Sequence, residues 1–170
     1  KNSFSNLGIT NQSETRILWD KKTGKSIYPA IVWEDTRTQK ICDNLPPKPK
    51  KEITWKTGLA ADPYFSATKI QWLLQNIPKA NSLLKERRLA FGTPDSWFLF
   101  RSAENNPHLT DYTNASRTLI FNIRNLKWDR GLLDIFKIPE SILPDPKPSA
   151  FFFGALKKEI LGFSLPILGM

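Results

Sequence analysis

Side chains that commonly carry out catalysis are few in this sequence, which has one histidine and one cysteine. His108 follows a proline in a polar segment and has no histidine or cysteine near it, which favours a surface side chain over a metal ligand. Cys42 is expected on the apolar face of a helix, as a small hydrophobic residue, because no CxxC spacing or adjacent histidine would activate its thiol. Neither a GxxxxGK(S/T) loop nor a GxGxxG motif is present. Residue types and spacing therefore name no reaction and predict no metal site.

The elements that must position any site alternate between strands and helices. Residues 16–19 and 27–33 are expected as strands joined by a hairpin turn over DKKTGK, with Pro29 at a sheet edge or bulge. Residues 35–45 are predicted to form a helix capped by Asp35 or Thr36. Pro46 ends that helix, and the following Pro/Lys-rich residues 46–52 are predicted to be an exposed linker.

The second half of the chain continues the alternation. Ser66 is expected to begin a helix that buries a stripe formed by Ile70, Leu73 and Leu74. Residues 78–88 then form a short helix, 89–93 a buried strand, and 94–103 a helix with Pro94 in its first turn and Trp97, Phe98 and Phe100 packed inward. Asp129 caps another helix, Pro139 starts a short one, and the chain closes with apolar strands in SAFFFG and LPILGM. These patterns predict an α/β domain with a mixed sheet flanked by helices.

Length and charge set the broad class. The 170 residues suit about one domain, although both ends look cut, and 40% hydrophobic residues support a packed core. No apolar run approaches the ~20 residues that a membrane-spanning helix needs. With a single cysteine, no internal disulfide can form, so the cytoplasm is the expected location. The net charge of +9 raises nucleic acid as a partner, but the lysines and arginines are scattered, which favours a solvated surface.

Three collinear segments carry the most specific pattern in the sequence. The first is GITNQSET, residues 8–15, followed by residues 17–38; the second is TGLAADPYFSATKIQWLLQN, residues 57–76. The third is FGTPDSWFLF, residues 91–100, with HLTDYTNASRTLIFNI at residues 108–123 and IPESILP at 138–144. Together they cover nearly the whole chain apart from the predicted linker and residues 154–164, and in this order they resemble the glycerol kinases within the FGGY family of carbohydrate kinases. A resemblance of this extent is more specific than any single motif.

The resemblance implies a fold and an activity. It implies that residues 1–170 are part of a ribonuclease-H-like (actin-like ATPase) domain, the polyol-binding N-terminal domain, without its first strands and its end. The intact enzyme would transfer a phosphoryl group from ATP, with Mg²⁺, to glycerol and produce sn-glycerol 3-phosphate. The catalytic aspartate is expected beyond Met170, so the chain alone would be inactive and would bind no cofactor. The intact enzyme could form a homo-oligomer, and no nucleic-acid partner is expected.

The resemblance also assigns the substrate-binding residues. Glu14 would accept hydroxyl hydrogens, Tyr64 would add a hydroxyl contact, and Trp33 would cover the carbon chain. Taken without the resemblance, a glutamate here is usually solvated and such aromatic residues usually pack in a core. Ser13 is the fourth predicted substrate-binding residue, although it departs from the family, which carries an arginine there. If the segment is a strand, Arg16 is expected on its opposite face, where it could not compensate. A kinase of another polyol or sugar, or a truncated non-catalytic homologue, therefore stays an alternative.

Overall fold

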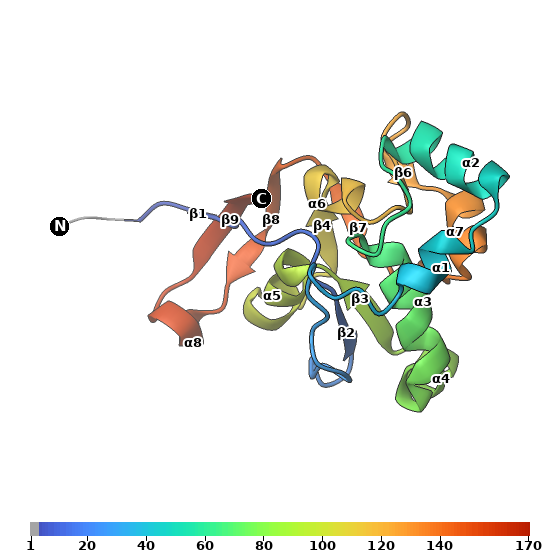
Figure 1. Ribbon diagram of the computed structural model, residues 1–170. Coiled ribbons are helices and arrows are strands. Elements are labelled where there is room, and N and C mark those ends of the chain that lie inside the picture. Colours follow the sequence, from blue (N-terminus) through green and yellow to red (C-terminus); the bar gives the residue numbers. More distant parts are fainter. Residues whose placement is uncertain (1–3) are drawn as a thin grey trace.

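The computed structural model describes residues 4–170 as an alternation of short strands and helices. Its strands are Leu7–Gly8 (β1), Ile17–Asp20 (β2), Leu89–Gly92 (β3), Leu109–Asp111 (β4), Phe121–Asn122 (β5), Lys127–Trp128 (β6), Asp145–Lys147 (β7), Ala150–Leu156 (β8) and Leu165–Gly169 (β9). Its helices are Gln39–Asp43 (α1), Pro47–Thr57 (α2), Ser66–Asn76 (α3), Pro78–Lys85 (α4), Pro94–Ser102 (α5), Tyr112–Ser116 (α6), Arg130–Phe136 (α7) and Lys158–Leu161 (α8), with a 3₁₀ turn at Glu140–Ile142 (η1). Figure 1 shows the helices α1–α4 and α7 at one end of the molecule and the long strands β8 and β9 at the other.

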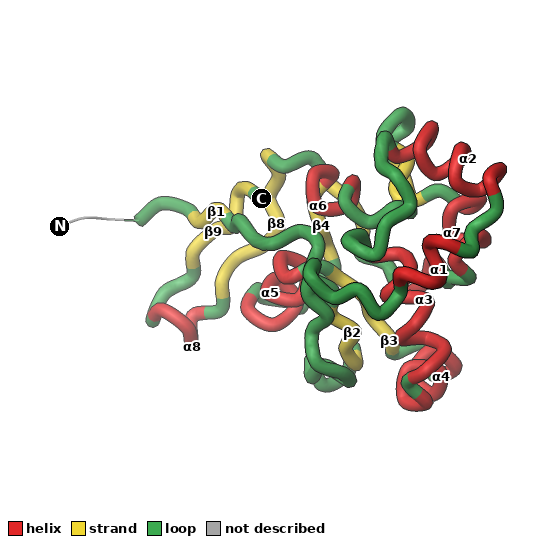
Figure 2. Tube along the Cα trace, in the orientation of Figure 1, coloured by secondary structure: helices red, strands yellow, loops and turns green. Residues whose placement is uncertain are grey.

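Strands pair in both directions, which confirms the mixed α/β class. β1 runs parallel to β9, and β9 runs antiparallel to β8. β2 and β3 are antiparallel, with Ile17 opposite Gly92 and Asp20 opposite Leu89. The pair β4 and β7 is parallel, and β5 and β6 are antiparallel. The pairs are separate small sheets joined by loops rather than one continuous sheet (Figure 2).

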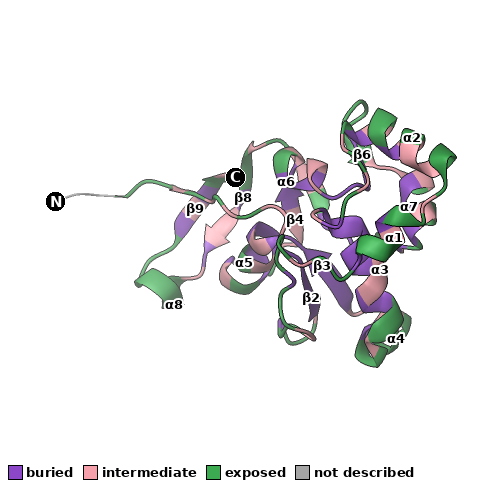
Figure 3. Cartoon of the chain, viewed as in Figure 1, coloured by how far each residue is buried: buried purple, intermediate pink, exposed green. Residues whose placement is uncertain are grey.

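The largest hydrophobic core is built around α3. Ile70 and Leu73 on this helix are buried against Leu18 of β2, Phe91 of β3 and Phe136 of α7. Ile70 and Leu73 lie on the predicted inward stripe of the helix, and burying each side chain contributes about 1.5–3 kcal/mol to stability. Buried residues accordingly concentrate along α3 and β3 in Figure 3. The core anchors both ends of α3, which positions the loop that precedes it.

Residues 46–52 are not a linker, because residues 47–52 form the first half of α2 and Pro46 is its N-cap. The predicted exposure is confirmed, since none of these residues is buried. Pro47 occupies the first helical position and Pro49 lies in the first turn, where backbone N–H groups have no intrahelical acceptor and proline costs little. One turn later, the fully buried Ile53 ties the helix to the core. Gly58, with a φ of 73°, ends the helix in the left-handed conformation.

The helix predicted over residues 35–45 is shorter than expected and spans Gln39–Asp43. Neither expected cap serves as one, because the Asp35 carboxylate accepts hydrogen bonds from both the backbone and the guanidinium of Arg37. These bonds hold residues 35–37 in a turn, and Thr38 takes the N-cap position. The turn displaces the helix start by one turn of helix.

Two further expectations need correction. The DKKTGK segment does form a turn, with Gly24 at a φ of 66° and its N–H donating to the Asp20 carbonyl. The second arm of the hairpin, however, consists of isolated bridges, Arg16 to Ile31 and Trp19 to Ser26, and not a regular strand. Phe98 is 39% exposed instead of packed inward, because the buried face of α5 carries its neighbours Leu99 and Phe100.

Candidate functional site

Glu14 lies in a turn that precedes β2, and not at the start of a strand. The turn is closed by the Thr15 N–H, which donates to the Gln12 carbonyl at 3.1 Å. The Glu14 side chain is 12% exposed, and its Oε1 accepts a hydrogen bond from Nε of Arg117 at 2.8 Å. Its Oε2 has no hydrogen-bond partner among residues 4–170. The ion pair thus orients the carboxylate and leaves one oxygen available to a ligand.

Trp33 and Tyr64 are brought together although 31 positions separate them in the sequence. Their ring centroids lie 5.8 Å apart with planes tilted by 58°, a favourable aromatic arrangement. Tyr64 is placed by the turn before α3, where its N–H donates to Oδ1 of Asp62 at 2.7 Å. Trp33 is 37% exposed. The pair therefore presents an apolar surface that solvent can reach.

A chain of contacts joins Glu14 to the aromatic pair. The guanidinium of Arg117, which holds Glu14, lies 4.9 Å from the ring centroid of Phe65, and this ring lies 5.2 Å from that of Tyr64. Three of the four predicted substrate-binding residues are thus connected through Arg117 and Phe65. Sequence reasoning did not single out Arg117, although it stands in the NASRT stretch of the resembling segments.

Ser13 and Arg16 do not share a regular strand, because Ser13 lies in a turn. Ser13 is half-buried in the turn and makes no side-chain hydrogen bond to the described residues. Arg16 is fully buried, and its Nη2 donates to the Tyr64 carbonyl at 2.5 Å. Residues 13–16 include a turn, so strand alternation does not set the direction of Arg16. That Arg16 does not replace the missing donor at position 13 stays a prediction. Burial lowers the pKa of Arg16 to about 9 against the opposing effect of the Glu14 charge.

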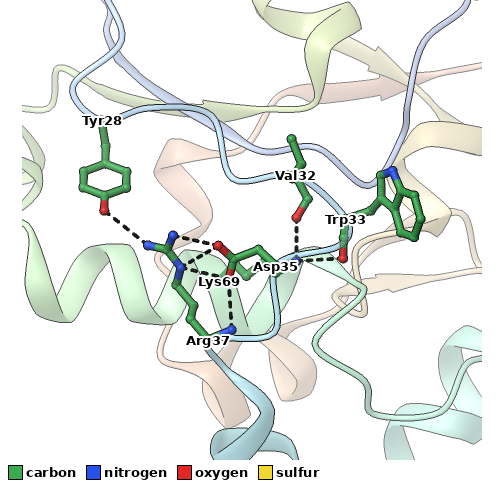
Figure 4. Close-up of polar contacts among 6 residues, drawn as sticks. All are labelled: Tyr28, Val32, Trp33, Asp35, Arg37 and Lys69. Carbon is green, nitrogen blue, oxygen red and sulfur yellow. Dashed lines mark hydrogen bonds and ion pairs between the residues drawn. The ribbon is translucent and has the colours of Figure 1, made fainter.

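A second buried cation, Lys69, lies beneath the Trp33 segment. Its Nζ donates to the carbonyls of Val32 at 2.9 Å and Trp33 at 3.3 Å (Figure 4). Burial, reinforced by the positive charge of Arg16, lowers the pKa of Lys69 to about 8. Alongside, Arg37 pairs with the Asp35 carboxylate and lowers its pKa. Two buried cations, Arg16 and Lys69, thus contact the backbone of the aromatic pair.

One cavity lies along the segment that precedes Glu14 in the sequence. It measures about 410 Å³ and is lined by residues 7–11 with Pro94, Asp95 and Phe98. Asp95 is buried there and accepts hydrogen bonds from Thr110 at 2.8 Å and Asn11 at 3.3 Å, and burial raises its pKa. None of the predicted substrate-binding residues lines this cavity.

The two side chains considered first for catalysis are structural. His108 is not a surface histidine, because its ring lies 5.1 Å from that of Trp19 and its Nε2 is 2.8 Å from the Phe91 carbonyl. Cys42 is buried as expected, and burial raises the pKa of its thiol to about 11. Among residues 4–170, no group of three or more His, Cys, Asp or Glu side chains could hold a metal ion.

Comparison with known proteins identifies the class. The N-terminal domain of the FGGY family of carbohydrate kinases matches residues 1–167, and the chain belongs to this family. Glycerol kinase 2 of Sulfolobus acidocaldarius is 50% identical over 169 residues, which are 99% of this chain and 34% of that protein. The glycerol kinase of Petrotoga mobilis is 48% identical over 171 residues, or 100% of this chain and 34% of its own length.

Solved structures agree with this assignment. The structure of Plasmodium falciparum glycerol kinase with ADP matches 98% of this chain and 34% of its own, with a TM-score of 0.90 and 38% identity. A xylulose kinase from Lactobacillus acidophilus matches with a TM-score of 0.83 at 23% identity, which supports the fold alone. The chain therefore spans about 34% of the length of the relatives it matches. Within residues 4–170, no helix is long and apolar enough to cross a membrane.

Proposed function

We propose that this chain forms part of the acceptor-binding domain of an ATP-dependent glycerol kinase that produces sn-glycerol 3-phosphate. The observation that carries the proposal is 50% identity to a glycerol kinase over 99% of the chain. The cluster of Glu14, Trp33 and Tyr64 supports it, because a charged acceptor beside an apolar wall suits a short polyol. The cytoplasm, which supplies ATP, is the proposed location.

Each residue has a proposed part in holding glycerol. The free Oε2 of Glu14 accepts a hydroxyl hydrogen, and the Arg117 ion pair orients the carboxylate. The rings of Trp33 and Tyr64 cover the carbon chain, and the Tyr64 hydroxyl adds a polar contact. Ser13, in the same turn as Glu14, offers a short hydroxyl. The chain thus contributes binding and orientation, which supply much of the catalysis in phosphoryl transfer.

ATP and Mg²⁺ are proposed for the whole enzyme. A bound Mg²⁺ would neutralise phosphate charge, but the described residues hold no cluster suited to it, so no step is assigned to a metal on this chain. The P. falciparum glycerol kinase was solved with ADP, which supports nucleotide use by the family member that carries this chain. Binding of ATP or Mg²⁺ by this segment alone is not proposed.

A second candidate is phosphorylation of a longer polyol or sugar. It is favoured by one observation: Ser13 occupies the place where the resembling kinases carry an arginine, which removes a long cationic donor from the pocket. A non-catalytic homologue that binds the acceptor without turning it over is a further alternative. Kinetics on glycerol and on a longer polyol separate these three possibilities.

The test uses paired variants of the full-length enzyme. Glu14→Ala is expected to nearly abolish glycerol phosphorylation, and Ser13→Arg to raise kcat/KM for glycerol by roughly 10- to 150-fold, the range for a hydrogen bond to a charged group. Glu52→Ala is the matched control, because Glu52 is also paired with a cation, Lys56, but lies on α2. The control should change kcat/KM by less than about twofold.

The glycerol assignment fails under a defined result. If Ser13→Arg leaves glycerol kinetics unchanged or worse while a longer polyol is the better substrate of the unmodified enzyme, then the pocket serves another acceptor. If Glu14→Ala behaves like Glu52→Ala, then Glu14 does not contact the substrate. Absence of phosphorylation of either compound by the unmodified enzyme would favour the non-catalytic homologue.

A further inference from the structure

Two buried cations hold the backbone of the two aromatic residues in the site. Lys69 donates to the carbonyls of Val32 and Trp33, and Arg16 donates to the carbonyl of Tyr64. Both cations are completely buried, with 0% exposure. The carbonyls lie in irregular segments, where no strand or helix supplies a regular donor. Each aromatic residue is therefore fixed by a charged donor from another part of the chain.

Neither cation forms an ion pair with a carboxylate of the described residues. The acidic side chains whose charges act on Arg16 are already paired, Glu14 with Arg117 and Asp35 with Arg37. In addition, Nε and Nη1 of Arg16 are buried without a hydrogen-bond partner in the described part of the chain. Burying a cation without an ion-pair partner costs free energy of folding, and apolar residues of similar volume are often at least as stabilising. Stability therefore does not explain why these two cations are here.

We propose that Arg16 and Lys69 are positioning residues that set the distance and tilt between the Trp33 and Tyr64 rings, and thereby the affinity for the acceptor. This inference rests on the proposed function, since it concerns the same pocket. The two rings belong to segments far apart in the chain, residues 31–36 and 61–65, which share no strand pairing. For residues 31–36, Lys69 adds its charged donor to the backbone bridge between Ile31 and Arg16. For residues 61–65, Arg16 supplies a charged donor from the position immediately before β2. Loss of either donor should loosen one ring relative to the other.

The experiment compares Arg16→Met and Lys69→Met in the full-length enzyme. Each is expected to raise KM for glycerol about tenfold, as for loss of a hydrogen bond to a charged group, while KM for ATP stays within about twofold. The matched controls are Arg88→Met and Lys56→Met, which remove cations paired with Asp20 and Asp129 away from the aromatic pair. The controls should leave KM for glycerol within about twofold.

A second measurement reports on the rings without relying on activity. Incorporation of 5-fluorotryptophan gives a ¹⁹F resonance for each tryptophan of the enzyme, including the six of this chain, and the Trp33 signal is assigned by its loss in Trp33→Phe. Arg16→Met and Lys69→Met should shift or broaden this signal, whereas the two controls should not. If a methionine variant does not fold, as judged by thermal unfolding, Arg16→Gln or Lys69→Gln replaces it under the same criteria.

The outcomes separate this inference from the proposed function. If the folded Arg16 and Lys69 variants match the controls in both KM for glycerol and the Trp33 resonance, the positioning role is overturned. If the unmodified enzyme does not phosphorylate glycerol, the proposed function fails, and the Trp33 resonance then decides the positioning role by itself. Equal increases in the KM values for glycerol and ATP would indicate a general loss of structure and would also overturn it.

Discussion

At the scale of single residues, the surroundings of a side chain decide what it can do. Glu14 would be an ordinary solvated glutamate by type, but its ion pair with Arg117 orients one oxygen and leaves the other free. His108 shows the opposite case, because a residue type associated with catalysis is packed against Trp19 and Phe100. Its role is to fill space and to donate one hydrogen bond.

His108 should make the stability of the protein depend on pH. Burial lowers its pKa from 6.5 to about 4, so between these values the unfolded chain binds a proton that the folded chain does not. The free energy of unfolding should therefore fall as the pH drops from 6.5 toward 4, by up to about 3 kcal/mol. Urea unfolding of the wild type and of His108→Gln at several pH values between 6.5 and 5 measures this effect.

The His108→Gln variant is the control for this experiment. His108 is the one histidine, so the substitution removes the side chain whose ordinary pKa lies in that range, and glutamine can still donate to the Phe91 carbonyl. The variant should show a flatter pH dependence than the wild type. Equal slopes would mean that the folded protein protonates His108 without cost.

At the scale of elements, helix starts follow rules that can be recognised in the sequence. Three helices, α2, α4 and α5, begin with a proline at the first position, namely Pro47, Pro78 and Pro94. The expected starts at Pro78 and Pro94 are confirmed, as is the Asp129 cap of α7. Pro47 follows the same rule, but it lay within a Pro/Lys-rich run that is equally typical of a linker.

The cap of α7 provides the prediction at this scale. Asp129 accepts a hydrogen bond from the Leu132 N–H at 3.1 Å and pairs with Lys56 of α2 at 2.7 Å, so it both caps one helix and joins it to another. Asp129→Ala should lower the free energy of unfolding by about 1–2 kcal/mol. Asp134→Ala, at an exposed position on the same helix, should change it by less than about 0.5 kcal/mol. Chemical denaturation compares them, and similar losses would contradict the role of the cap.

At the scale of the whole molecule, the chain matches one part of a longer enzyme. It spans 34% of the length of the glycerol kinases it resembles, and the residues that we propose to hold the acceptor lie within that part. The lysines and arginines that give the net charge of +9 are scattered along the chain, and several of them are paired with carboxylates. That nucleic acid is no partner stays a prediction, to be tested by salt-dependent retention on DNA.

We expect the isolated 170 residues not to phosphorylate glycerol. Phosphoryl transfer requires acceptor and nucleotide to be held in line, and we assign to this chain only the acceptor. The measurement is ATP-dependent formation of glycerol 3-phosphate by the purified chain, with a heat-killed sample as the control. Product above that control would show that this third of the enzyme holds the nucleotide as well.

The sequence by itself determined the family, the alternation of strands and helices, and the buried stripe of α3, because these depend on local patterns and collinear motifs. It did not determine that residues 47–57 form helix α2, since a Pro/Lys-rich segment is typical of both a linker and a helix start. The helix is decided by the burial of Ile53 in the core, which is a tertiary contact. Nor did it place Arg16, Lys69 and Arg117 around the candidate site. Their partners are backbone carbonyls and a carboxylate far away in sequence, and such contacts exist only once packing has brought the segments together.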